Sequence, residues 1–263
     1  MRRLISLVAV SMMVAVLAVP AGAQEEARIH LIHGIPDTPV DDVAGGEVVF
    51  GDFQFGDTQD LSALAGETLA GLQVVLAGTD TVAIDAGDTA LPASGNYTIV
   101  AHLDATGTPT LAVFENDTSA ISAGEGRLTV RHTAAAPAVD VLANGAVAFS
   151  NLSNPDGVSA DLAAGTISAE VVPTGATEPV VIGPVDLPIE EGSSLIVYAV
   201  GSLEAGSITA LTESISGLGS APTAINTGNS PVQSSVPVWA AGLGALLGVA
   251  AIAARRSIVA LNR

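Results

Sequence analysis

The feature that most constrains the fold is an internal repeat. The segment from Arg127 to Phe149 reads RLTVRHTAAAPAVDVLANGAVAF, and the segment from Arg28 to Phe50 reads RIHLIHGIPDTPVDDVAGGEVVF. Arg, His, Val, Asp, Ala, Gly, Val and Phe hold the same positions in both segments without a gap. Solenoid units run about 20–50 residues. A period of roughly 99 residues is longer than that, and it predicts a tandem of two whole domains.

Both copies have the composition of short β-strands. Runs rich in Val, Ile, Leu, Thr and Tyr alternate with Gly, Asn, Asp and Pro, as in a sandwich or barrel. The expected strands of the first copy are Arg28–His33, Glu47–Phe50, Thr68–Ala77, Thr81–Asp85, Tyr97–Leu103 and Thr110–Glu115. Those of the second copy are Arg127–His132, Val139–Leu142, Ala146–Phe149, Thr166–Val172, Val180–Ile182, Leu195–Val200 and Ser207–Thr212. No segment between the two ends of the chain sustains a helical period.

The opening strand of each copy has one apolar face. Side chains alternate between the two faces of a strand. One face carries Ile29, Leu31 and His33 in the first copy, and Leu128, Val130 and His132 in the second. The other face carries Arg28, His30 and Ile32, and Arg127, Thr129 and Arg131. The recurrence of this pattern predicts a shared core position for the histidine.

The N-terminus has the pattern of a secretory signal peptide. Two arginines precede the apolar run Leu4–Val19, and Ala21-Gly22-Ala23 offers the small residues that a signal peptidase accepts. We therefore expect residues 1–23 to be removed and the mature chain to begin near Gln24. The alternative is an uncleaved anchor, although the run is shorter than the roughly 20 residues of a spanning helix.

The C-terminus has the pattern of a single membrane span. Val236–Ala254 is uncharged, and its length suits a hydrocarbon core of about 30 Å. Trp239 suits the outer interface and the Arg255-Arg256 pair the cytoplasmic one. We expect the domains outside, residues 255–263 as a cytoplasmic tail, and residues 214–235, rich in Gly, Ser, Asn and Pro, as a flexible stalk.

Composition narrows the classes of partner and site. The chain has no Cys, which excludes disulfides, zinc–thiolate sites and thiol catalysis. All 27 acidic residues lie between Glu25 and Glu213, with only three arginines among them, so this region carries 3 − 27 = −24. Such a charge repels phosphate backbones and argues against nucleic acid as a partner. The acids are dispersed, which favours a solvated surface over a Ca²⁺ site.

The two repeated segments resemble the opening signature of DUF4397, a family of exported bacterial proteins. In that signature an Arg-initiated strand ends in His, a Pro-bearing loop follows, and a Val-Asp-Val strand leads to a Gly turn. The resemblance covers about Ala27 to Ser220. This chain departs from it at TAAAP in the second copy and at VDDV in the first. The resemblance implies a β-sandwich at a bacterial surface, and the family has no assigned activity.

The fold that we expect is all-β. It consists of two tandem immunoglobulin-like β-sandwich domains, at residues 27–118 and 126–213, with a joint between them at Thr118–Gly126. The signal peptide precedes them, and the stalk and one transmembrane helix follow.

A His–Asp spacing of eight residues recurs in both copies. His33 is followed by Asp41, and His132 by Asp140. Such a pair could act as a general base or as part of a metal site. A structural role is favoured, in which a carboxylate or backbone carbonyl holds a core histidine, because neither copy supplies a third repeated group.

Two further pairs belong to the repeat signature. Arg28 and Arg127 are two of the three basic residues in the acidic region. One role that they could have is an ion pair with Asp41 or Asp140. Gly46 and Gly145 suit hairpin turns with positive φ.

The function that these features favour is a non-catalytic module anchored in the membrane and displayed at the cell surface. Its partner would be an unknown extracellular protein or envelope polymer, with no cofactor. Two alternatives remain open: an extracellular hydrolase that uses carboxylates or the His–Asp pair, and a structural stalk stiffened by Ca²⁺.

Overall fold

The computed structural model describes residues 26–219, in which every long element is a β-strand. The first half contains β1 (Arg28–His33), β2 (Val40–Ala44), β3 (Glu47–Phe53), β4 (Thr58–Asp60), the short 3-10 helix η1 (Ser62–Leu64), β5 (Thr68–Leu76), β6 (Val82–Ala90), β7 (Asn96–Leu103) and β8 (Pro109–Glu115). The second half contains β9 (Glu125–His132), β10 (Val139–Ala143), β11 (Ala146–Leu152), β12 (Gly157–Ala163), β13 (Gly165–Pro173), β14 (Ile182–Ile189), β15 (Ser194–Val200) and β16 (Thr209–Ile215).

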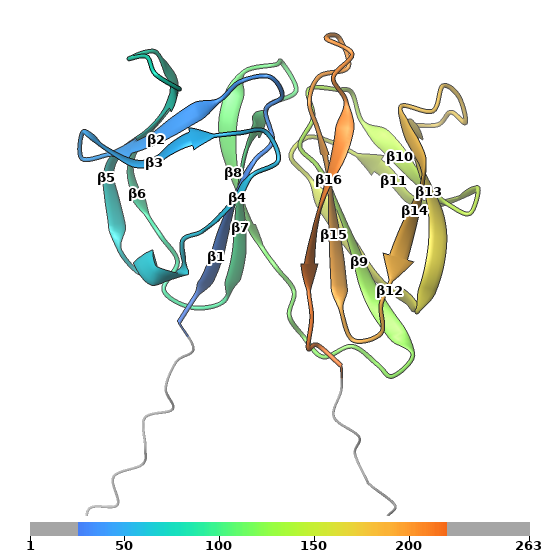
Figure 1. Cartoon of the computed structure of the whole chain (residues 1–263). Helices are drawn as coiled ribbons and strands as arrows, with labels where there is room; N and C mark the ends of the chain where they lie inside the picture. Colours follow the sequence, from blue (N-terminus) through green and yellow to red (C-terminus); the bar gives the residue numbers. More distant parts are fainter. Residues whose placement is uncertain (1–25, 220–263) are drawn as a thin grey trace, which may run out of the picture. The chain divides into compact units, whose positions relative to one another are not determined.

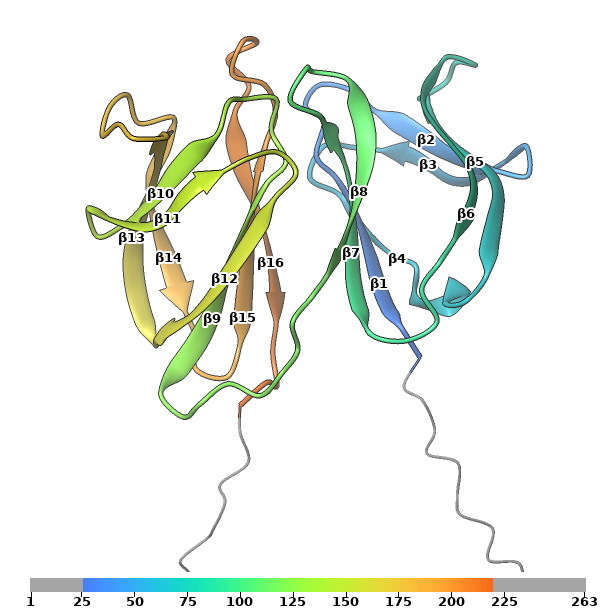
Figure 2. The ribbon, with the colours of Figure 1, turned by 180° about the vertical axis from the view of Figure 1, so that it is seen from behind.

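The predicted all-β class is confirmed, and each half repeats the same two four-stranded sheets (Figures 1 and 2). The first half has the sheets β4-β1-β7-β8 and β3-β2-β5-β6. The second half has β12-β9-β15-β16 and β11-β10-β13-β14, in the same order of equivalent strands. Each half contains one parallel pair, β1 with β7 and β9 with β15.

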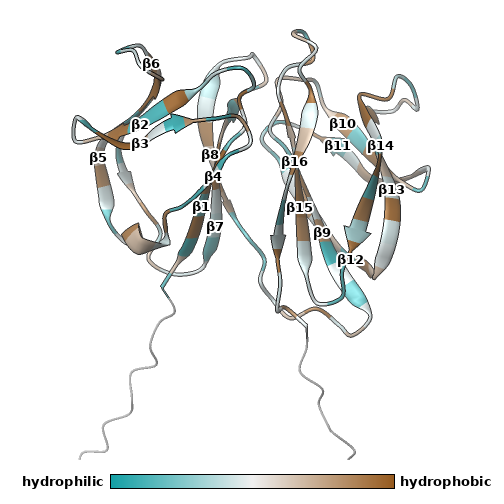
Figure 3. Ribbon diagram, viewed as in Figure 1, coloured by the Kyte–Doolittle hydropathy of each residue, from teal (hydrophilic) through white to brown (hydrophobic). Residues whose placement is uncertain are grey.

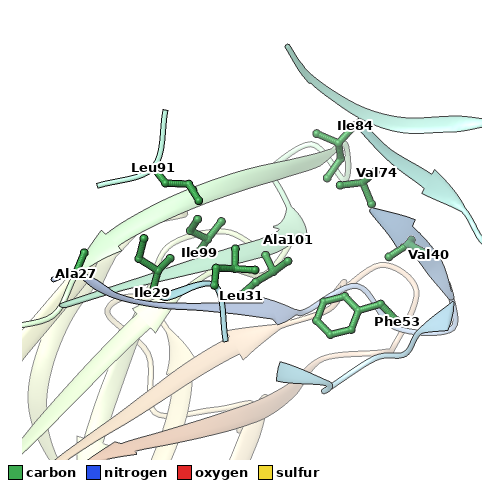
Figure 4. Packing of buried hydrophobic residues seen from close by; sticks show 11 residues of the cluster. Ala27, Ile29, Leu31, Val40, Phe53, Val74, Ile84, Leu91, Ile99 and Ala101 are labelled. Atoms are coloured by element: carbon green, nitrogen blue, oxygen red, sulfur yellow. The ribbon is translucent and has the colours of Figure 1, made fainter. Parts of the chain in front are cut away.

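Each half encloses an apolar core between its two sheets. In the first half this core is built around Ile29, Leu31, Val40, Val74 and Ile99 (Figure 4). In the second half Leu128, Val130 and Val139 take the places of Ile29, Leu31 and Val40, and Val141 joins the same core. Figure 3 shows apolar and polar residues following one another along strands such as β2 and β14, as expected for strands with one buried face. The predicted core face of the opening strands is confirmed.

The predicted hairpin glycines lie in two-residue turns. Gly45 and Gly46 connect β2 to β3 with φ of 61° and 82°. Asn144 and Gly145 connect β10 to β11 with φ of 51° and 77°. Positive φ at both central residues is the requirement of a type I′ turn, which matches the twist of the flanking strands.

Several strands differ from the sequence prediction. The strands β2, β4 and β12 were not predicted. Two adjacent acids interrupt the apolar pattern of β2, and β4 is short and polar. β12 is an edge strand of its sheet, and small residues, several of them polar, occupy most of its positions. The strand expected at Val180–Ile182 instead begins at Ile182 and runs to Ile189. Pro184 and Pro188 lie on this strand, β14. It can accommodate them because it is at the edge of its sheet, where a missing N–H is tolerated.

The predicted limits of the joint and stalk also shift. Glu125 and Gly126 belong to β9 rather than to the joint, and β16 continues to Ile215. The Ile121 amide donates a hydrogen bond to the Leu218 carbonyl at 2.7 Å, so the chain beyond β16 packs on the joint. Residues 1–23 and 236–254 lie outside the described residues. Between residues 26 and 219 there is no helix long and apolar enough to span a bilayer.

Candidate functional site

The first signature aspartate clamps two backbone segments. Asp41 alone on β2 opposes two residues, Gly51 and Asp52, on β3, which is a β-bulge. Asp52 takes a φ of 54° in this bulge. The Asp52 amide donates to Asp41 Oδ1 at 2.7 Å, and the amide of Gly78, in the turn after β5, donates to Oδ2 at 3.2 Å. The carboxylate therefore ties the bulge to the neighbouring turn.

The second copy builds the same clamp. The Asn151 amide donates to Asp140 Oδ1 at 2.8 Å, and the Gly175 amide donates to Oδ2 at 2.8 Å. Asn151 takes a φ of 55°, matching its counterpart Asp52. These two backbone donors hold the pKa of Asp140 below its usual range.

We expect Asp140→Ala to lower the melting temperature, because it leaves the amides of Asn151 and Gly175 without their acceptor. Asp140→Asn, which keeps one carbonyl oxygen as an acceptor, should lower the melting temperature less. The lowered pKa implies that the stabilising contribution is present above about pH 4 and is lost as pH falls further. Thermal denaturation measures this, with the exposed Asp186→Ala as the control. Equal effects of Asp140→Ala and Asp186→Ala would disprove the clamp.

The signature histidines are buried and bind backbone carbonyls. His33 Nε2 lies 2.6 Å from the Thr38 carbonyl, and His132 Nε2 lies 3.0 Å from the Pro137 carbonyl. Both side chains are at most 1% exposed, and burial lowers the pKa of each. Each ring thereby holds the loop that crosses from one sheet to the other. In neither copy does the structure bring the repeated His and Asp together, so the geometry does not support them as a general-base pair.

Acidification should destabilise the protein through its buried histidines, which also include His102. Burial holds the pKa of all three below the ordinary value of about 6.5, so the unfolded chain binds more protons. The contribution to stability is complete above pH 6.5 and falls as pH drops. We expect His132→Gln to reduce the loss of melting temperature between pH 7 and pH 5. An undiminished loss would contradict burial of a neutral ring.

The signature arginines differ between the copies. Arg28 is exposed, whereas Arg127 is 6% exposed. Arg127 forms a bidentate pair with Asp161 of β12, at 2.7 and 3.0 Å. Its Nη1 also contacts Asp117 Oδ2, just before the joint, at 3.0 Å, and donates to Ser119 Oγ of the joint at 3.2 Å. The predicted pair with Asp140 is therefore wrong, because that carboxylate is occupied by backbone amides. Arg127 instead fastens the joint to the second sandwich.

The outward faces of β1 and β7 meet β15 of the second half at an apolar cluster. Ile32 and Val100 from the first half pack with Ile196, Tyr198 and Val200 from the second, and all five are at most 3% exposed. The faces that the sequence assigned opposite the cores thus form an interface between the copies. Because equivalent sheets contribute from both sides, the contact resembles the self-complementary interface of a symmetric dimer.

A buried arginine lies at the centre of this interface. Arg131 is 3% exposed, and its guanidinium carbon lies 4.4 Å from the centroid of the Phe114 ring. Its Nη1 donates to the Tyr198 hydroxyl at 2.8 Å, and its Nη2 donates to Asn116 Oδ1 at 2.7 Å. Phe114 and Asn116 belong to the end of the first half, so Arg131 of β9 contacts both copies.

Glu213 completes the network from β16. Its Oε2 accepts hydrogen bonds from the hydroxyls of Tyr198 and Thr98, each at 2.8 Å. Its Oε1 lies 2.6 Å from His30 Nδ1. Burial and the Glu213 charge raise the pKa of Tyr198, which keeps the phenol protonated as a donor. Thr98 and His30 come from the first half, so this carboxylate also connects the copies.

The sequence did not single out these interface residues. The alternation in β9 placed Arg131 opposite the core, but nothing in one strand indicates which surface covers that face. Asp42, which lines a cavity of the first sandwich, was visible only as an irregularity in VDDV. Over the described range 26–219, no group of three or more His, Asp or Glu side chains is arranged to hold a metal ion.

Comparison with known proteins agrees with the repeat signature. Residues 27–142 match the model of the family described as Domain of unknown function (DUF4397). The match spans the first sandwich and continues through β9 into β10 of the second. A comparison with curated proteins gives no match. The chain therefore carries a DUF4397 match over residues 27–142.

Proposed function

We propose that this chain is an exported, single-pass membrane protein that displays two immunoglobulin-like β-sandwiches outside the cell for adhesion, envelope organisation or partner binding. Residues 1–23 have the charge, apolar run and small residues of a signal peptide. Val236–Ala254 has the length and composition of a membrane span. The high negative charge of the region between them suits a solvated, repulsive surface.

The contact between the two copies is the observation that carries this proposal. Arg131 and Glu213 join the sandwiches through hydrogen bonds with Asn116 and Thr98 of the first half, and apolar side chains surround them. A braced pair can present a fixed surface at a distance from a bilayer. The His33 and Asp41 side chains, together with their counterparts in the second copy, are used in backbone hydrogen bonds, which supports a structural role for the signature.

Cysteine labelling on intact cells tests the topology, because the native chain contains no Cys. Val147→Cys places a thiol at an exposed position of the second sandwich, and Ser257→Cys places one in the predicted tail. We expect a membrane-impermeant maleimide to label Val147→Cys on intact cells and Ser257→Cys only after permeabilisation. Labelling of both variants only after permeabilisation would refute external display.

The partner requires a separate experiment. Capture from intact envelopes with the full-length chain, at low and high salt and with and without Ca²⁺, should recover an extracellular protein or polymer. The matched control is Arg131→Ala, in which the brace between the sandwiches is removed. Recovery of nothing under every condition would count against the binding role while leaving the topology unaffected.

A further inference from the structure

The first sandwich encloses a cavity of about 160 Å³ between its two sheets. Apolar side chains such as Leu31, Phe50, Val74 and Ile99 line it. Val49 and Val113 also line it and are 41% and 57% exposed, so the cavity reaches the surface of the sandwich. An engineered apolar cavity of about 150 Å³ is large enough to bind benzene. The space therefore suits a compact apolar group.

One carboxyl group faces this apolar space. Asp42 of β2 lines the cavity and is 4% exposed. Its cross-strand neighbours Phe50 and Val74 line the same cavity. Asp42 Oδ2 has no hydrogen-bond partner among residues 26–219. A buried acceptor without a partner is costly, and such a group calls for a specific explanation.

Water is a poor partner for this oxygen. A buried water normally needs two to four polar neighbours. The other polar side chain that lines the cavity is Thr89, whose hydroxyl donates to the Ala86 carbonyl at 3.3 Å. A donor that arrives with its own apolar body would satisfy Asp42 and fill the space together.

The second sandwich shows that the carboxyl is not required by the fold. Its corresponding cavity, of about 400 Å³, is lined by Val130, Val141, Val171 and Val197, and no titratable side chain lines it. Strand pairing makes these residues the counterparts of Leu31, Asp42, Val74 and Ile99. The same position therefore carries Val141 in one copy and Asp42 in the other. The cavity is repeated, and the carboxyl belongs to the first copy alone.

We propose that the cavity of the first sandwich binds a small hydrophobic amine, whose ammonium group pairs with Asp42 and whose apolar body fills the space between the sheets. The dense negative charge of the surrounding chain attracts cations to the protein surface. An ammonium ion supplies the donor and opposite charge that the buried carboxylate lacks.

The ionisation of Asp42 gives the binding a pH dependence. Burial, together with the charge of the neighbouring Asp41, raises the pKa of Asp42 to about 6. No other titratable side chain lines the cavity. Amine binding should therefore strengthen between pH 5 and pH 7.5, whereas binding of an uncharged isostere should not change.

Benzylamine and the uncharged toluene, which has the same ring and methylene carbon but no amino group, are suitable probes. The full-length chain in detergent micelles, with labelled Ile, Leu and Val methyl groups, is titrated with each. Methyl shifts of Val74 and Ile99 report the first cavity, and those of Val171 and Val197 report the second. This local readout separates cavity binding from partition into detergent. We expect toluene to shift both sets and benzylamine to shift the first set at lower concentration.

The matched variant is Asp42→Val, which gives the first copy the residue of the second. It should weaken benzylamine binding about 10- to 100-fold, as expected for losing a hydrogen bond to a charged group, and leave toluene binding intact. Retained toluene shifts show that the variant is folded. Ala86→Leu, which fills the cavity, should abolish both. Benzylamine that binds no more tightly than toluene, that is unaffected by Asp42→Val, or that fails to shift the first set would overturn the proposal.

Discussion

Arg131→Ala should destabilise the protein by about 3–5 kcal/mol, the usual cost of removing one member of a buried charged network. The substitution leaves Asn116 Oδ1 without its donor and removes the guanidinium from the Phe114 ring. It also deprives Glu213, whose side chain is 10% exposed, of the cation that acts on it through Tyr198. Denaturant unfolding of the full-length chain in detergent measures the change.

The exposed Arg28→Ala is the matched control, with an expected change within about 0.5 kcal/mol. A double-mutant cycle with Glu213→Ala tests whether the two residues act together. We expect the double variant to lose less than the sum of the single losses, because Arg131 and Glu213 share Tyr198. Two results would show that the network does not hold the copies together. One is strict additivity of the two changes in unfolding free energy, and the other is a loss of stability from Arg131→Ala no larger than that from Arg28→Ala.

Asp42→Val should stabilise the protein at pH 7.5 by about 3 kcal/mol. The pKa of Asp42 is raised from an ordinary value of 3.8 to about 6. Each unit corresponds to about 1.4 kcal/mol. Because the folded state binds the proton more tightly, stability falls as pH rises from about 4 to 6 and stays lower above that range. Valine at this position removes the penalty, as Val141 already does in the second copy.

The difference in unfolding free energy between Asp42→Val and the native chain should therefore be large at pH 7.5 and small at pH 4.5. Taking this difference cancels the opposite pH dependence of the buried histidines, which are present in both proteins. The exposed Asp186→Val serves as the control, with no pH-dependent difference. A gain of equal size at both pH values would mean that cavity filling, and not charge burial, is responsible.

The regular features of the fold were predictable because they follow from local rules. Period-two alternation identified Ile29 and Leu31 as core residues, and the NG dipeptide at Asn144 identified a hairpin. The alternation and the hairpin glycine occur in both copies, so each copy supported the prediction made from the other. Edge strands such as β12 carry weaker patterns, since they bury one face only partly.

The features that determine the candidate sites were not predictable from local patterns. The polar face of β9, with Arg131, looks like a solvated surface until the equivalent face of the first copy covers it. Asp41 and Asp42 are adjacent acids in the sequence, yet alternation along β2 directs one to backbone amides and the other into the cavity. Their different roles depend on a bulge in β3 and on the strands that face β2, neither of which the sequence specifies locally.

The distance between the two sandwiches provides the most direct test of the claim that they form one braced unit. Val48→Cys on β3 and Val147→Cys on β11 occupy equivalent exposed positions, and a chain without native Cys accepts spin labels only there. For the full-length protein in detergent, pulsed electron–electron double resonance should give a single narrow distribution of spin–spin distances. This distribution should broaden when Arg131→Ala is added. A broad distribution in the otherwise native chain would contradict a braced pair and would describe two independent domains on a flexible joint.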